Sequence, residues 1–61
     1  MNTKEMIMVG VANEGEFSFN VEDIKLWEPK NITHSGLTVL FKHEDKFYLM
    51  KREDFKRIFE N

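Results

Sequence analysis

The chain contains no cysteine, has one proline and carries no excess of positive charge. The absence of cysteine excludes disulfide bonds and thiolate zinc sites, and it fits a reducing compartment. The formal net charge of −2 is not the basic footprint of a typical nucleic-acid-binding domain. No stretch approaches the roughly 18 apolar residues of a membrane helix, and no signal-peptide pattern is present. We therefore expect a cytoplasmic protein without a membrane partner.

The length of 61 residues predicts a single small domain, residues 1–61, with residues 1–5 flexible. A chain of this size buries only about 60% of its unfolded surface, and such domains usually need disulfides, a metal or a partner chain. Six phenylalanines, one tryptophan and one tyrosine supply a compact core and argue against disorder. With disulfides excluded, dense packing or oligomerisation is the expected source of stability.

Alternating apolar residues predict strands over residues 6–12, 16–21, 37–42 and 47–50. Ile24 and Leu26 continue an inward alternation after the second of these strands. A helix is predicted over residues 52–60, because Phe55, Ile58 and Phe59 fall on one face. The connections are short, so the expected α+β fold is a four-stranded antiparallel meander with one C-terminal helix packed on one face.

The predicted sheet is apolar on both faces, and the helix can cover only one of them. We expect it to cover the face with Phe17, Phe19, Ile24, Leu26, Val39 and Phe41. The other face would then expose six large side chains, namely Met6, Met8, Trp27, Leu40, Tyr48 and Met50. Since monomers rarely expose such a face, we predict a homodimer interface there, formed by Met8, Leu40, Tyr48 and Met50. The alternative is that these residues are scattered singly, or that the loop 28–36 folds over them.

The segment 28–36 is the longest predicted connection, and it adjoins the only tryptophan. Long loops are often functional, and tryptophan is enriched in binding hot spots. We therefore predict that a protein partner binds here, on Trp27, Glu28, Pro29 and His34. Alternatively, Trp27 is a packed aromatic residue at the edge of the domain.

The predicted helix carries a group of basic residues, Lys51, Arg52, Lys56 and Arg57, which are candidate phosphate contacts. Glu53, Asp54 and Glu60 are interleaved with them, so a solvated face with local charge pairs is the simpler interpretation. These four residues support the alternative function of a nucleic-acid-binding regulator.

Little in the sequence points to catalysis. His43, Glu44 and Asp45, with His34, could be drawn as a metal site, but three consecutive turn residues point in different directions. We predict no catalytic residue, no metal and no cofactor. The expected function is that of a non-enzymatic regulatory or inhibitory protein that binds a protein partner. A binder of a small ligand such as a nucleotide, at a dimer interface, is a further alternative.

Several short segments follow the order seen in two bacterial families. They are Phe17-Ser18-Phe19-Asn20, Glu22-Asp23-Ile24, Thr38-Val39-Leu40, Phe47-Tyr48-Leu49 and the helix 52–60. In this order the chain resembles FlbD-type small flagellar proteins, and it is similar to the first part of LytTR-type DNA-binding domains. The resemblance implies a sheet followed by a helix, and no site residue is carried over from either family.

Overall fold

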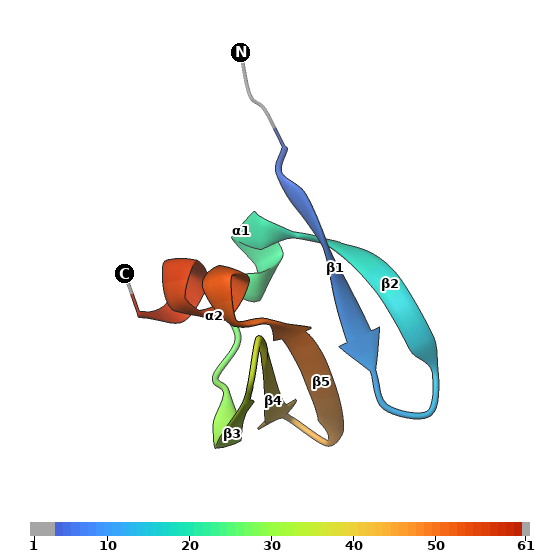
Figure 1. The fold of residues 1–61 in the computed structure, drawn as a ribbon. Helices are drawn as coiled ribbons and strands as arrows, with labels where there is room; N and C mark the ends of the chain where they lie inside the picture. The colour runs from blue at the N-terminus through green and yellow to red at the C-terminus, as the bar shows by residue number, and fades with distance from the viewer. Residues whose placement is uncertain (1–3, 61) are drawn as a thin grey trace.

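The computed structural model describes residues 4–60, which form one five-stranded antiparallel sheet and two short helices (Figure 1). The α+β class is thus confirmed. The elements follow the order β1 (Met6–Val11), β2 (Gly15–Asn20), α1 (Val21–Ile24), β3 (Lys30–Ser35), β4 (Thr38–His43), β5 (Lys46–Lys51) and α2 (Arg52–Phe59).

The sheet has the strand order β2-β1-β5-β4-β3, so the predicted simple meander is wrong. Two hairpin units, β1–β2 and β3–β4–β5, are joined through antiparallel pairing of β1 with β5, where Gly10 lies opposite Leu49. This long-range pairing places β2 and β3 at the two edges of the sheet.

Strand β3 occupies most of the segment predicted as a loop. All six of its residues are exposed, so it lacks the apolar alternation by which strands are recognised. Its register with β4 shifts between Lys30 and Thr33, and Asn31 has a positive φ of 52°. Gly36, at φ 62°, forms the tight turn into β4, so this glycine belongs to the β3–β4 hairpin and not to a long loop.

The residues after β2 form a short helix and do not continue a strand. The side chain of Asn20 caps α1 by accepting a hydrogen bond from the Glu22 N–H at 2.9 Å. Val21 and Ile24, three residues apart, are both buried. Leu26, predicted to point inward, is 81% exposed, because the helical turn breaks the alternation.

Both helices lie on the same side of the sheet and enclose the core (Figure 1). Phe55 of α2 is 1% exposed and packs with Phe41 of β4, at a ring-centroid distance of 5.6 Å. Ile58 and Phe59 are partly buried against the same core, so the predicted apolar stripe of the helix is confirmed. The remaining buried residues are Ile7, Val9, Val11, Val21, Ile24, Val39 and Met50.

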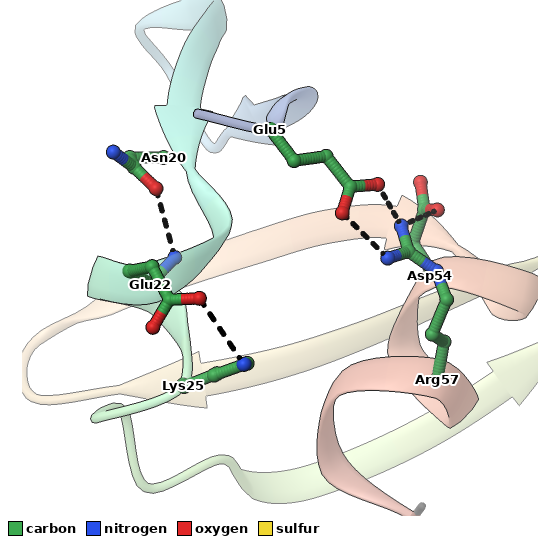
Figure 2. A network of polar contacts seen from close by, with 6 residues as sticks. All are labelled: Glu5, Asn20, Glu22, Lys25, Asp54 and Arg57. Carbon is green, nitrogen blue, oxygen red and sulfur yellow. Dashed lines mark hydrogen bonds and ion pairs between the residues drawn. The ribbon is translucent and has the colours of Figure 1, made fainter. Parts of the chain in front are cut away.

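The N-terminal end of β1 is attached to both helices. The carbonyl of Glu5 accepts a hydrogen bond from the Val21 N–H at 2.9 Å. The Glu5 carboxylate pairs with Arg57 of α2 at 2.7 Å, as Figure 2 shows. Arg57 also pairs with Asp54 at 3.1 Å. Glu5 is therefore held in place, while the expected flexibility of residues 1–3 lies outside the described residues.

Candidate protein-binding surface

The face of the sheet opposite the helices is apolar and uncovered. We call it the open face; it consists of Met6, Met8, Leu40, Phe47 and Leu49, which are 38–52% exposed. Its middle row runs across the strands through Gly10, Leu49 and Leu40, which are register neighbours on β1, β5 and β4. These side chains all lie on one face of the three central strands β1, β5 and β4, so they are not scattered over the surface.

The open face is hollowed above Gly10. The hollow has a volume of about 330 Å³ and is lined by nine residues, including Leu40, Phe47, Leu49 and Glu16. Gly10 leaves this space because it has no side chain of its own. At one corner the ammonium of Lys42 lies 5.8 Å from the ring centroid of Phe47, so the patch has a charged margin.

The predicted dimer residues divide between the two faces. Met8 and Leu40 lie on the open face, as expected, whereas Tyr48 and Met50 point to the covered face and Met50 is 2% exposed. Phe47 and Leu49 take their places. The orientation of β5 follows from its register with β4. Lys42 pairs with Phe47 across the hairpin turn, so Phe47 lies on the same face as Lys42 and Leu40. The short turn between the two predicted strands was the sequence feature that could have indicated this register.

A second depression, which we call the basic groove, lies where α2 begins. It has a volume of about 720 Å³ and is lined by Leu37, Thr38, Lys51, Arg52, Glu53 and Lys56. Leu37 is 79% exposed there, although it follows the turn glycine and was expected inside a strand. Thr38 and Lys51, which pair in the sheet, connect the groove with the end of the open face.

The structure separates the four predicted phosphate contacts into two groups. Arg57 lies between Glu5 and Asp54, and these carboxylates raise its pKa above the usual value through hydrogen bonds (Figure 2). Within residues 4–60, Lys51, Arg52 and Lys56 form no ion pair, and all three line the basic groove. The groove is therefore the part of α2 where positive charge is not neutralised.

The start of α2 departs from the usual capping pattern. Its N-cap residue is Lys51, whose side chain forms no capping hydrogen bond, and basic residues at this end oppose the helix dipole. The Arg52 N–H donates to the Leu37 carbonyl at 2.8 Å, which fixes α2 to the β3–β4 turn. Glu53 and Asp54 in the first turn offset part of the unfavourable charge.

Trp27 is half-buried in an aromatic cluster on the covered side, so it is placed as a packed residue and not as an exposed anchor. Its ring centroid lies 5.3 Å from that of Phe19, 4.5 Å from Tyr48 and 4.9 Å from His43, on which it stacks with an interplanar angle of 10°. The Glu28 N–H donates to Nδ1 of His43 at 3.2 Å, which locks the chain after α1 onto β4.

The four predicted partner-binding residues do not converge. Trp27 and Glu28 contact His43, whereas exposed His34 pairs with Val39 and lies against Phe55. Val39, the partner of His34, and His43 are four residues apart on β4, which corresponds to about 13 Å along the strand. Nor do His34 and His43 come together as metal ligands, and in the described part of the chain no group of three His, Asp or Glu side chains is placed to hold an ion.

A surface ion pair joins the two hairpin turns next to the open face. Lys46, at the start of β5, lies 3.0 Å from Glu14 in the β1–β2 turn. The hydrogen bond and charge of Glu14 raise the pKa of Lys46 above its usual value. This pair supports the pairing of β1 with β5, which joins the two hairpin units within the sheet.

No family model, curated protein or solved structure matches this chain. The resemblance to FlbD-type and LytTR-type proteins therefore stays a prediction. Within residues 4–60, neither helix has the length and apolar composition needed to cross a membrane.

Proposed function

We propose that this chain is a small non-enzymatic regulatory or inhibitory protein, which acts by binding a protein partner and does so as a homodimer. The observation that carries the proposal is the open face, where five large apolar side chains lie uncovered on one side of the sheet. The cysteine-free composition fits action in a reducing compartment such as the cytoplasm.

The size of the open face suits an interface between two copies. The whole side of the five-stranded sheet that contains the open face measures roughly 400–500 Å² on each copy, from six-residue strands at the usual strand spacing. Two such sides bury roughly 800–1,000 Å², which is the size of a small, weak interface. A flat sheet face can pack on its own symmetry mate, and the hollow above Gly10 offers space for an apolar side chain of the second copy.

Sedimentation velocity at micromolar concentration tests the dimer. We expect twice the monomer mass for the unchanged chain, and the monomer mass for Leu49→Lys, because a charge at the centre of the open face opposes burial. Leu26→Lys is the matched control, since Leu26 is more exposed and follows α1, away from the open face. A monomer at millimolar concentration, or equal effects of the two substitutions, would contradict the proposed dimer.

A further inference from the structure

We infer that the basic groove is the partner-binding site, and that its ligand is an acidic segment of a protein in which an apolar residue accompanies the carboxylates. This inference rests on the proposed function, because it names the chemistry of the protein partner. It replaces the site predicted around Trp27, whose indole is engaged in the aromatic cluster.

The first argument is charge complementarity. Lys25, Lys46 and Arg57 each pair with a carboxylate of the chain, whereas Lys51, Arg52 and Lys56 have no such partner among residues 4–60 and share one depression. Three unpaired cations against one carboxylate, that of Glu53, leave the groove positive in a chain whose net charge is negative. Carboxylates of a partner would be attracted to this place.

The second argument concerns the local chemistry at the start of α2. A lysine at the N-cap and an arginine after it are unfavourable at the positive end of a helix, and the Lys51 side chain forms no capping hydrogen bond, although the Arg52 N–H donates to the Leu37 carbonyl. A carboxylate seated in the groove would offset this unfavourable charge and form charge-assisted hydrogen bonds with the basic side chains.

The third argument separates a peptide from a nucleic acid. Leu37 is 79% exposed within the groove, which favours a ligand with an apolar side chain, and the groove contains no aromatic ring on which a base could stack. Glu53 interrupts the positive charge, and Arg57, the next basic residue along α2, is held by Glu5 and Asp54. A phosphate backbone would need a longer continuous track of cations.

The test is a titration of the ¹⁵N-labelled chain, followed by amide chemical shifts, with three probes. They are the peptide acetyl-Glu-Glu-Leu-Glu-Glu-Leu-amide, the same peptide with serine in place of leucine, and a single-stranded DNA oligonucleotide. We expect the leucine peptide to shift the amides of Leu37, Thr38, Arg52 and Glu53. We expect the serine peptide and the DNA to bind more weakly.

Two variants of equal charge change locate the site. Lys51→Glu/Lys56→Glu should weaken binding of the leucine peptide by about tenfold or more, since both charges face the ligand. Lys4→Glu/Lys30→Glu, with exposed lysines outside the groove, should change it by less than about threefold. Leu37→Ser should reduce the preference for the leucine peptide over the serine peptide.

Three results would overturn the inference. They are shifted amides outside the groove, equal weakening by both double variants, and equal or tighter binding of the DNA with a steep loss between low and moderate salt. The last of these results would favour nucleic-acid binding over protein binding as the function of this chain. A chain that sediments as a monomer but still binds the peptide in the groove would contradict only the homodimer.

Discussion

The indole of Trp27 lies parallel to the imidazole of His43, with ring centroids 4.9 Å apart and planes within 10° of each other. The imidazole also accepts the Glu28 N–H through Nδ1 at 3.2 Å. His43, which was weighed as a metal ligand in the sequence and not favoured, therefore has a structural role: it fixes the segment between α1 and β3 against β4.

We predict that His43→Phe preserves the stack but loses the acceptor for the Glu28 N–H. The expected loss of stability is about 0.5–1.5 kcal/mol, the net contribution of one hydrogen bond. His43→Ala should cost more, because the stacking contact, worth about 0.5–1.5 kcal/mol beyond burial, is lost as well. Urea unfolding of both variants measures the difference. Equal stability of the two variants would show that the stack contributes nothing.

Phe55 should be the residue of α2 on which folding most depends. It is 1% exposed and contacts Phe41 and Phe59, so Phe55→Ala should cost about 3–5 kcal/mol. A domain of this size has little more than that in total stability, so we expect a largely unfolded chain at room temperature.

Circular dichroism and thermal unfolding measure this effect, with Leu26→Ala as the control. Leu26 is 81% exposed, and its substitution should change stability by less than about 0.5 kcal/mol. A cooperative transition for Phe55→Ala close to that of the unchanged chain would contradict the role of α2 in the core.

The elements that the sequence predicted well are those with a clear apolar period. The stripe of Phe55, Ile58 and Phe59 identified α2 to within one residue, and alternation located β1, β2, β4 and β5. Strand β3 was missed because an exposed edge strand has no buried face to produce a pattern. Helix α1 was missed because the apolar pair Ile24 and Leu26 predicted a strand, whereas in the structure Asn20 caps a helical turn there.

The candidate site was predictable only in part. Met8 and Leu40 were assigned to the open face from alternation alone, but β5 is apolar on both faces, and only the pairing of Lys42 with Phe47 orients it. Lys51, Arg52 and Lys56 were singled out from the sequence as a basic group, but the basic groove that they line could not be predicted. It depends on the contact of Arg52 with the carbonyl of Leu37, between residues that no short-range pattern connects.

The ion pair between Lys46 and Glu14 gives a prediction about pH. Glu14 raises the pKa of Lys46 in the folded chain, so folding favours the protonated form of the lysine. The stabilisation is thus fully present below the usual pKa of 10.5 and is lost as the pH rises through the higher folded value.

Lys46→Gln should therefore lower the melting temperature slightly at pH 7, and the difference from the unchanged chain should disappear at strongly alkaline pH. High salt at pH 7 should also reduce it, because both partners are exposed. Lys30→Gln, another exposed lysine of the sheet, serves as the control. A difference that persists unchanged above the raised pKa would show that the effect comes from packing of the lysine stem.

Gly10 allows stability and dimerisation to be tested separately. An alanine Cβ there would lie 3.6 Å from the Cβ and the carbonyl oxygen of Leu49, which is ordinary contact, and Gly10 does not have the positive φ seen at Gly15 and Gly36. Gly10→Ala should therefore stabilise the fold by about 0.4–1 kcal/mol, chiefly by restricting the unfolded chain.

The methyl group of Gly10→Ala also fills part of the hollow on the open face, so dimerisation should weaken if a side chain of the second copy occupies this hollow. Thermal unfolding at low concentration and sedimentation across a concentration series measure the two effects. Gly15→Ala is the contrasting variant, since at φ 110° it should destabilise the turn despite open space around it. A stabilised Gly10→Ala variant with an unchanged dimer would place the contact between copies away from the hollow.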